Sequence, residues 1–460
     1  MAFRKHQITR RESFATLGVG LPAFSLGLSG CHNAKSSPKE LAADFAVIGG
    51  GLGGCAAALS ALQSGLTVIM TEETNWIGGQ LTSQGVPPDE HQWIESFGCT
   101  QTYRDLRNAI RSHYKKNYQL TADARGNKTL NPGSGSVSRL CHTPRVALAC
   151  LEAKLEPFIS SGKLTLLKQT IPIAVEANND EVKSVEVLNL ESNNHLILHG
   201  RYFADATELG DLLPMAKCEH VVGTEGRNVT GELHMPEKAS RTNQQAFTMC
   251  FAIDHNEGEN HTIDQPSEYS FWKNFTPEIT PPWPGPLLDF KYTHPSSGLS
   301  KRLGFNPTGP QKKGIINLWT YRRILAAKNF LPESGLQDIS LINWPQNDYL
   351  LGNLVDVNRD EQKKHIARAK QLSLSLLYWL QTEAPRDDGG QGWPGLRLRS
   401  DIMGTSDGLA KYPYVRESRR IKALTTILEQ HCGVENRMKI LGLNDAKSLS
   451  AKRYPDSVGI

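Results

Sequence analysis

The chain has 460 residues, of which 39% are hydrophobic and 21% charged, and its formal net charge is +4. This length allows a large core and more than one domain, and the composition excludes a disordered chain or a fibre. Residues 1–30 carry four basic residues and one acid, so the rest is close to neutral, which gives a nucleic-acid partner no support.

The N-terminal residues 1–30 resemble an export signal. Adjacent Arg10 and Arg11 precede an apolar stretch that is too short and too rich in glycine to span a membrane. The arginine pair resembles a twin-arginine signal, and "LSGC" at 28–31 resembles a lipobox, which implies acylation of Cys31. The alternative is a plain signal peptide with an incidental cysteine. Both alternatives predict an exported protein, either periplasmic or anchored as a lipoprotein.

Residues 44–73 predict a strand, a glycine-rich turn, a helix and a second strand. The apolar run before Gly49 is typical of a strand that is buried on both faces of a parallel sheet. Gly49, Gly51 and Gly54 match the pattern GxGxxG: the first permits a tight turn, the second lets the backbone approach a pyrophosphate, and the third allows close helix packing. We therefore expect a Rossmann-like βαβ unit that binds a dinucleotide at the helix N-terminus.

An acid and a second glycine pair indicate which dinucleotide binds. Glu72 ends the second strand, where it is placed to accept hydrogen bonds from ribose hydroxyls, and Glu73 is the less favoured choice. Gly78, Gly79 and Gln80 follow in a stretch that resembles the GG motif of FAD proteins. The resemblance implies FAD rather than NAD.

A second cofactor motif is expected within residues 201–212. The run Ala204-Asp205-Ala206-Thr207 ends an apolar strand and resembles the Asp-Ala-Thr-Gly motif of flavoproteins, with Gly210 kept nearby. Glu208 stands where that motif has glycine, so we expect a looser or different approach of the backbone there. The resemblance implies that Asp205, Thr207 and Gly210 contact the cofactor.

The resemblance extends over most of the chain, to a bacterial family of FAD-dependent oxidoreductases that is distantly similar to fumarate-reductase-type flavoproteins. The stretches that carry it include "GGQLTSQGVPPDEHQW", "SRLCHTPRVAL", "NLWTYRRI", "INWPQNDYLLGN" and "YPYVRESRRI". It implies an α/β fold, with a Rossmann-like FAD-binding domain and an inserted mixed α+β substrate domain. Family members continue beyond "RYPDSVGI", so the resemblance also implies that this chain is truncated at its C-terminus.

The domain organisation follows from these motifs. We expect an FAD-binding domain over 44–215, interrupted by an insertion over about 82–138 in which residues 116–136 form a long loop. A substrate-side domain over 216–400 and a segment over 401–460 that returns toward the FAD site complete the chain. Within the second domain, Asn358 with Glu361 predicts a helix start, and Pro385 predicts its end.

The eight cysteines indicate neither a metal site nor a redox pair. None of them is spaced as CxxC, which argues against a zinc ribbon, an iron–sulfur cluster and a thioredoxin-type pair. We expect buried free thiols apart from Cys31, and no metal.

Five residues are candidates for contact with substrate or cofactor. His91 closely follows the GG motif, with an exposed loop histidine as the alternative, and His142 and Arg145 precede a helix that they could instead cap. Arg416 lies in a dense basic cluster beside Tyr414, where guanidinium groups can bind a carboxylate or phosphate, and a solvated helix start is the alternative. We expect His91, His142, Tyr414 and Arg416 to be catalytic, and Arg145 to bind the cofactor.

The predicted function is oxidation or reduction of an organic small molecule by hydride transfer at flavin N5. The chain has one GxGxxG pattern, so a second, nicotinamide-binding domain is not indicated, and oxygen, a quinone or another carrier is the expected electron acceptor. A non-catalytic flavin-binding chain and a redox-neutral FAD enzyme remain as alternatives. Whether FAD is covalently attached, for example at a histidine or cysteine, stays open.

Overall fold

The computed structural model describes residues 38–294, 297–442 and 444. The predicted export signal over 1–30 and the predicted lipid anchor at Cys31 lie outside these residues, as does the end of the predicted 401–460 segment. From residue 38 onward the described chain forms one compact unit. The predicted domain boundaries at 215 and 400 stay predictions.

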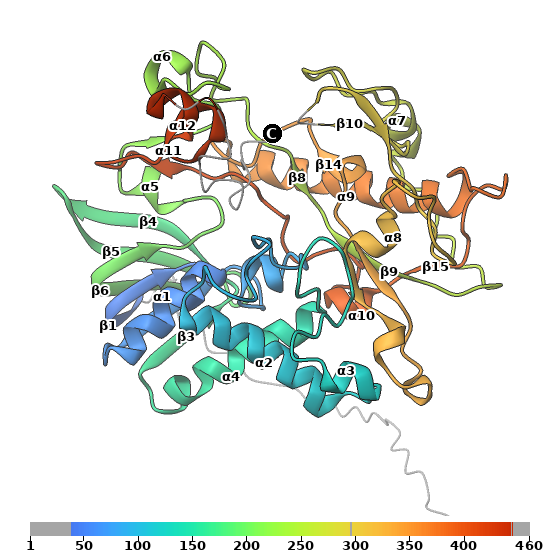
Figure 1. Cartoon of the computed structure of the whole chain (residues 1–460). Coiled ribbons are helices and arrows are strands. Elements are labelled where there is room, and N and C mark those ends of the chain that lie inside the picture. Colours follow the sequence, from blue (N-terminus) through green and yellow to red (C-terminus); the bar gives the residue numbers. More distant parts are fainter. Residues whose placement is uncertain (1–37, 295–296, 443, 445–460) are drawn as a thin grey trace, which may run out of the picture. The chain divides into compact units, whose positions relative to one another are not determined.

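The first sheet has six strands in the order β3-β2-β1-β6-β5-β4 (Figure 1). The strands are β1 (Lys39–Ile48), β2 (Val68–Glu72), β3 (Leu164–Lys168), β4 (Thr170–Asn178), β5 (Glu181–Asn189) and β6 (His195–Asp205). β3, β2, β1 and β6 are parallel neighbours, whereas β4, β5 and β6 form an antiparallel meander. The carboxyl ends of β1, β2 and β6 therefore meet at one edge of the sheet, where ligands of open α/β sheets bind.

The predicted βαβ unit is confirmed. β1 ends at Ile48, α1 (Leu52–Gln63) starts four residues later, and β2 follows with all five residues buried, as expected for a strand covered on both faces. Helix α1 packs against both strands and buries the alanine and leucine side chains of its inner face. The observed first strand starts at Lys39, five residues earlier than predicted.

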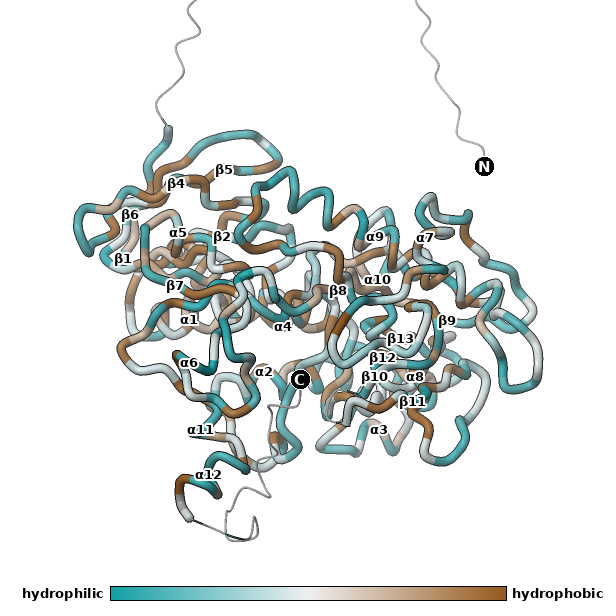
Figure 2. The backbone as a smooth tube through the Cα atoms, turned by 90° about the horizontal axis from the view of Figure 1, so that it is seen from above, coloured by the Kyte–Doolittle hydropathy of each residue, from teal (hydrophilic) through white to brown (hydrophobic). Residues whose placement is uncertain are grey.

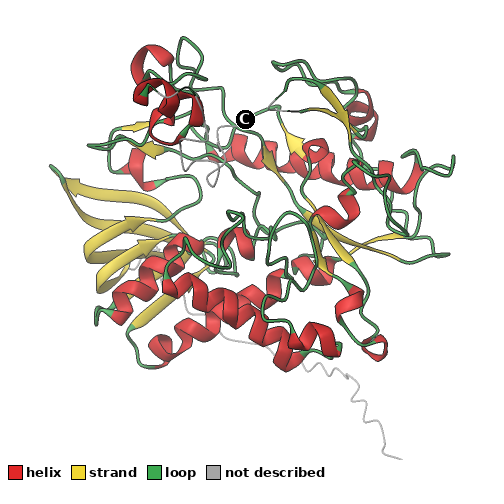
Figure 3. Cartoon of the chain, viewed as in Figure 1, coloured by secondary structure: helices red, strands yellow, loops and turns green. Residues whose placement is uncertain are grey.

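Helices α2 (Gln101–Asn117), α3 (Ala122–Gly126) and α4 (Pro144–Ser160) belong to the first region, and α2 packs against α4 (Figure 3). The predicted long loop over 116–136 was wrong in part, because α2 runs to Asn117 and α3 lies within the predicted loop. The hydroxyl of Thr121 accepts a hydrogen bond from the backbone N–H of Ala124 at 3.3 Å, which caps α3. A local cap thus forms a helix where the polar and glycine-rich composition predicted none.

The second region is built on a four-stranded sheet in the order β12-β13-β9-β15 and on the long helix α9 (Figure 1). Its strands are β9 (Phe251–His255), β12 (Arg323–Leu325), β13 (Ile339–Ile342) and β15 (Leu396–Leu398). Helix α9 (Arg359–Thr382) starts as predicted, since Asn358 Oδ1 accepts a hydrogen bond from the N–H of Glu361 at 2.9 Å. The mixed α+β character expected for this region agrees with these elements.

The remaining elements are short. The two-stranded pairs comprise β7 (His220–Val221) with β16 (Arg420–Ile421), β8 (Phe247–Thr248) with β14 (Asp348–Tyr349), and β10 (Lys291–Thr293) with β11 (Ser300–Arg302). The short helices are α5 (Leu212–Met215), α6 (Arg227–Thr230), α7 (Tyr269–Asn274), α8 (Leu318–Tyr321), α10 (Ser400–Met403), α11 (Glu429–Cys432) and α12 (Val434–Leu441), and the 3₁₀ turns are η1 (Gly79–Leu81), η2 (Ala327–Asn329), η3 (Pro332–Ser334) and η4 (Pro345–Asn347). Helix α10 contacts both α4 and β9, so it joins the two regions.

One large hydrophobic core runs from α1 and α4 through β9 and β13 to α9, and a smaller one lies within the first sheet. Hydrophobic residues colour much of the first sheet in Figure 2, whereas many surface loops are polar. Among the described helices, none combines the length and the apolar character that crossing a membrane requires. The seven cysteines of the described residues are all free thiols, and Cys55, Cys141, Cys150 and Cys250 are buried, as expected. Cys99 is half-buried and Cys218 and Cys432 are exposed, so for these three the expected burial was wrong.

Candidate functional site

The glycine turn after β1 is held tightly against the loop after β6. Gly49 has φ +110°, and a Cβ atom on it would lie 2.0 Å from the carbonyl oxygen of Ala206. Its N–H donates to Thr71 Oγ1 at 3.0 Å, which fixes the turn to the end of β2. A Cβ on Gly54 would lie 2.0 Å from the carbonyl oxygen of Gly49. Gly49 and Gly54 thus have the steric roles predicted for them.

The start of α1 faces a cavity. Gly51 is the N-cap of α1 and no side chain caps this end, so the first N–H groups of the helix have no side-chain acceptor. A Cβ on Gly51 would lie 2.9 Å from Glu208 Oε1, and its next neighbours would be 3.8 Å or more away. This helix end is a site where negative charge is favoured.

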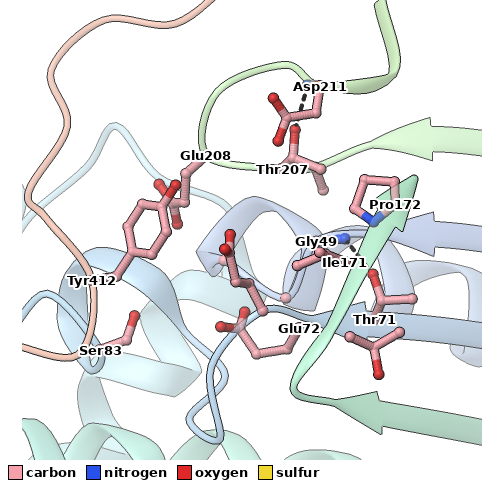
Figure 4. A pocket seen from close by; sticks show the side chains of 15 residues that line it. Gly49, Thr71, Glu72, Ser83, Ile171, Pro172, Thr207, Glu208, Asp211 and Tyr412 are labelled. Carbon is pink, nitrogen blue, oxygen red and sulfur yellow. Dashed lines mark hydrogen bonds between the residues drawn. The ribbon is translucent and has the colours of Figure 1, made fainter. Parts of the chain in front are cut away.

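The cavity lies between the carboxyl ends of β1, β2 and β6 and measures about 30 Å³ (Figure 4). The residues that line it come from six segments of the chain. They are Gly49, Gly50, Gly51, Thr71, Glu72, Glu73, Ser83, Thr170, Ile171, Pro172, Ala206, Thr207, Glu208, Asp211 and Tyr412. Of the residues predicted to bind the cofactor, the cavity therefore includes Gly49, Gly51, Glu72 and Thr207.

Glu72 is buried at the cavity wall, with 6% of its surface exposed. Its Oε1 accepts hydrogen bonds from the N–H and the hydroxyl of Thr74, at 2.8 and 2.7 Å, while Oε2 lies toward Gly50. Burial, together with the neighbouring Glu208 and Glu73, raises the pKa of Glu72 to about 7, against the opposing hydrogen bonds of Thr74. One carboxylate oxygen is thus free of Thr74 and can accept from a ligand hydroxyl.

The second motif forms a loop that its own side chains hold. Asp205 accepts hydrogen bonds from the Thr207 hydroxyl at 2.7 Å and from the N–H of Leu212 at 2.9 Å, and Thr207 Oγ1 accepts from the N–H of Asp211 at 2.7 Å. Asp205 is absent from the cavity wall, so the expectation of direct cofactor contact is replaced by a role in shaping the loop. Gly210, at φ +68°, likewise serves the turn and faces Arg419 rather than the cavity.

The cavity is acidic. Glu72, Glu73, Glu208 and Asp211 all line it, and burial is the largest cause of a raised pKa in each of them. Positive charge comes from Arg359, which acts on Glu73 and Asp211, and from Arg419, whose Nη1 lies 3.0 Å from Asp211. No group of three or more His, Cys, Asp or Glu side chains suited to a metal ion occurs in the described part of the chain.

The GG motif leads from this cavity to a second cluster. A Cβ on Gly79 would lie 2.6 Å from Glu208 Oε1, so the backbone of the motif adjoins the cavity. The next residue, Gln80, donates from Nε2 to Asp89 Oδ2 at 3.1 Å, and the Tyr414 hydroxyl donates to the same Asp89 oxygen at 2.8 Å. Burial and then Asp89 raise the pKa of the Tyr414 hydroxyl, so it holds its proton at neutral pH.

Arg416 is engaged by protein groups on both of its terminal nitrogens. Nη1 donates to Ala246 O at 2.8 Å and to Thr248 Oγ1 at 3.0 Å, while Nη2 donates to Asp348 at 2.9 Å and to Asn343 at 3.2 Å. Its guanidinium carbon lies 4.8 Å from the centre of the Tyr414 ring. Arg416 therefore ties the C-terminal segment to the second region and supports Tyr414, instead of offering a free fork to an anion.

The other predicted residues lie elsewhere. His91 contacts Gly98 O through Nε2 at 3.3 Å and accepts from the N–H of Trp93, within an aromatic loop. His142 is 1% exposed, and burial lowers its pKa to about 4, so it is neutral and enclosed. Arg145 donates to Asp401 O at 2.8 Å and covers Trp76, which corrects the expected cofactor contact, because the first turn of α4 directs it toward α10. The catalytic roles of His91 and His142 stay predictions.

Several residues of the site were not predicted. Tyr412 and Ser83 come together because the N–H groups of Lys411 and Tyr412 donate to Ser83 O at 2.9 and 3.2 Å. Asp89 follows the GG motif in "VPPDEH", and an acid so close to the motif was a signal that could have been used. Thr170, Ile171 and Pro172 carry no such signal: they begin β4 directly after β3 ends at Lys168, and β4 contacts β2.

The cavity suits the pyrophosphate and ribose of a dinucleotide in most respects. The bare Gly51 backbone, the uncapped end of α1 and the free oxygen of Glu72 provide the approach, the anion site and the hydroxyl acceptor that such a ligand needs. Glu208 is the exception, because its carboxylate lies against both glycine segments. The residues of the cavity therefore fit FAD, except that the Glu208 carboxylate occupies part of the space.

Similarity to known proteins also indicates the family and the cofactor. The family described as "FAD dependent oxidoreductase" matches residues 44–460. Among curated proteins no relative matches the chain. Solved structures that resemble it include L-proline dehydrogenase from P. horikoshii, with 16% identity over 41% of this chain and 25% of that one and a TM-score of 0.21. A geranylgeranyl bacteriochlorophyll reductase-like protein from Thermoplasma acidophilum has 13% identity over 48% and 49%, with a TM-score of 0.28.

The rebeccamycin biosynthetic enzyme RebC with reduced flavin shows 14% identity over 47% of this chain and 39% of that chain, with a TM-score of 0.30. The chain thus spans at most about half the length of these three structures. The family match covers both glycine motifs, the cavity and the Tyr414 cluster. The chain belongs to the family of FAD-dependent oxidoreductases, and FAD is the cofactor that this membership implies.

Proposed function

We propose that the chain is an exported FAD-dependent oxidoreductase that oxidises or reduces an organic small molecule. One observation carries the proposal: the GxGxxG turn, the end of β2 with Glu72 and the loop after β6 converge on a single cavity, with the GG motif beside it. This arrangement supports binding of the ADP half of FAD by the end of α1 and by Glu72. When bound, FAD supplies the group that accepts or donates a hydride.

The chain's own residues supply orientation and a proton. The end of α1 and the bare face of Gly51 would hold the pyrophosphate, and Glu72 would accept hydrogen bonds from the adenosine ribose. Tyr414 is the proposed proton carrier, because its hydroxyl is held protonated and is oriented by Asp89, which Gln80 also contacts. Arg416 acts as a positioning residue through the Tyr414 ring.

Location and partners belong to the same proposal. The paired arginines and the "LSGC" stretch support export to the periplasm or anchoring through acylated Cys31. A small-molecule substrate and an acceptor such as oxygen, a quinone or another carrier complete the redox cycle. A flavin-binding chain without catalysis is the second candidate.

The first experiment is the visible absorption spectrum of the purified chain, before and after acid precipitation. Flavin bands that move to the supernatant are expected for non-covalent FAD, and bands in the pellet for covalent FAD. Anaerobic bleaching of these bands by an organic substrate, with Tyr414→Phe as the slow variant, supports an oxidoreductase. A colourless protein that binds no added FAD contradicts the proposal, and bound flavin that no substrate or reductant changes favours the second candidate.

A further inference from the structure

Glu208 lies where a dinucleotide phosphate is expected. A Cβ on Gly51 would be 2.9 Å from Glu208 Oε1, and a Cβ on Gly79 would be 2.6 Å from the same atom. The carboxylate therefore fills the space that the missing side chains of both glycine motifs leave. Figure 4 shows its side chain at the cavity beside the Tyr412 ring.

Two physical effects act on this carboxylate. The uncapped end of α1 favours a negative charge, so in this position Glu208 substitutes for a ligand anion. The groups that face it are mostly acidic or neutral: Glu72 and Glu73 at the end of β2, Asp211 on its own loop, Tyr412 from the C-terminal segment, and Gln84. The cations Arg359 and Arg419 act on Glu73 and Asp211.

A pyrophosphate and an ionised Glu208 cannot share this position. They compete for the same end of α1, and their charges repel at short range in a buried cavity. Two escapes exist, since the side chain can rotate away from the glycines or take up a proton. Burial raises the pKa of Glu208, which makes its protonation easier than that of an exposed carboxyl.

We propose that Glu208 makes FAD binding proton-linked: this carboxyl takes up a proton from solvent when the cofactor binds, and the ionised side chain weakens cofactor binding. The inference rests on the proposed function, because it concerns the same cavity. It assigns Glu208 as the residue that sets cofactor affinity, a role that the glycine usual at this place in the motif cannot have. In the unliganded chain the Glu208 carboxylate occupies the cavity, and FAD binding is favoured as the pH falls.

The test compares FAD dissociation constants of the whole chain over pH 5.5–8.5, measured by quenching of FAD fluorescence. Glu208→Gln keeps the shape of the side chain and removes its charge, and Glu208→Gly restores the usual motif residue. A rise of one unit in the pKa of Glu208 on binding corresponds to about tenfold weaker binding above that pKa. Both variants are therefore expected to bind about tenfold more tightly than wild type at high pH, and the gap is expected to close at low pH.

A matched control separates position from charge. Glu73 lines the same cavity, but the atoms nearest to the open faces of Gly51 and Gly79 belong to other residues, Glu208 first among them. Glu73→Gln should change the pH dependence much less than Glu208→Gln. Titration calorimetry in two buffers of different ionisation enthalpy measures the same effect directly, since wild type should take up more protons on binding than Glu208→Gln does.

The difference between wild type and Glu208→Gln isolates this group, because Glu72, with its own raised pKa, is common to both. Equal dissociation constants at every pH, or equal proton uptake, overturn the inference while FAD binding stands. Failure of wild type and of every variant to bind FAD overturns the proposed function and the inference with it. Binding by Glu208→Gly alone would show that the bulk of the side chain and not its charge limits binding, which overturns the inference while the proposed function stands.

Discussion

The glycine cavity and the Tyr414 cluster are built in different ways. The glycine turn of the cavity is local, because Gly49 to Glu72 form one βαβ unit, and the loop after β6 joins it through the long-range pairing of β6 with β1. The cluster joins Asp89 to Tyr414, 325 positions apart in the chain, and Arg416 to Asp348, 68 positions apart. The comparison teaches that cofactor binding is specified by local motifs, whereas the proposed reaction centre depends on how the C-terminal segment packs.

The largest expected effect comes from Gly49→Ala. The new Cβ would meet a backbone carbonyl at 2.0 Å, and the φ of +110° adds strain of about 1–3 kcal/mol, so we expect loss of FAD binding and a clearly lower melting temperature. Gly65→Ala is the control for strain alone, since its φ is +91° and no heavy atom lies within 4 Å of its Cβ position. Circular dichroism on heating measures both, and equal losses in the two variants would contradict the packing argument.

Tyr414→Phe tests the other region. Removal of a positioned proton carrier is expected to slow substrate-dependent flavin reduction by about 10²–10⁴-fold, with FAD affinity little changed. Tyr202→Phe, at a side chain that is 61% exposed, is the control. Stopped-flow reduction kinetics give the rates, and a wild-type rate in Tyr414→Phe removes this residue from the mechanism.

Glu72→Gln tests how the buried carboxyl in the cavity affects stability. The pKa of Glu72 is about 7 in the folded chain against 4.5 as the ordinary value, so the folded state holds the extra proton and stability falls as the pH rises through this window. Glu72→Gln should therefore stabilise the unliganded chain above pH 7 by up to about 3 kcal/mol and leave it unchanged below pH 4.5. Urea unfolding at several pH values measures the gap, and a gap that is independent of pH rules out this account.

Arg416→Gln breaks the long-range contact that supports Tyr414. Asp348 loses its ion pair, and we expect a loss of about 2 kcal/mol, because both side chains remain about one quarter exposed. In a double-mutant cycle, Asp348→Asn should cost less in the Arg416→Gln background than in wild type. Additive losses in urea unfolding would show that the pair does not interact.

Asn358→Ala is expected to have the smallest effect, because it removes one local contact. Loss of the cap at the start of α9 should cost about 1 kcal/mol of unfolding free energy, with no change in FAD affinity. Lys363→Ala, at an exposed position of the same helix, is expected to have almost no effect. An effect of Asn358→Ala on FAD binding would instead couple this helix to the cavity.

Much of the first region could be predicted because each signal acts within a few residues. The strand–turn–helix order, the steric need for glycine at 49 and 54, and the acid at the end of β2 are properties of one short stretch. The start of α9 at Asn358 was predictable for the same reason. The short helix α3 was missed because its cap at Thr121 lies in a polar stretch that composition alone assigns to a loop.

The rest of the site depends on tertiary packing that periodicity and spacing do not encode. Arg145 in the sequence stands next to a helix start, but its direction is set by Asp401, 256 positions away. Asp205 matches a cofactor motif, yet its carboxylate is used by its own loop. Arg416 stands in a basic cluster of the sequence. In the structure its guanidinium is already occupied by Asp348, Ala246 O and Thr248 Oγ1.

The reactivity of the buried thiols reports on the local opening of each region. Burial raises the pKa of Cys55 and of Cys250 to about 12, so almost no reactive thiolate exists while either side chain is enclosed. Cys55 lies in α1, where its thiol donates to Gly50 O, and Cys250 lies between β8 and β9 in the second region. Alkylation of each cysteine, followed by mass spectrometry, would therefore measure separately how often the first and the second region open locally.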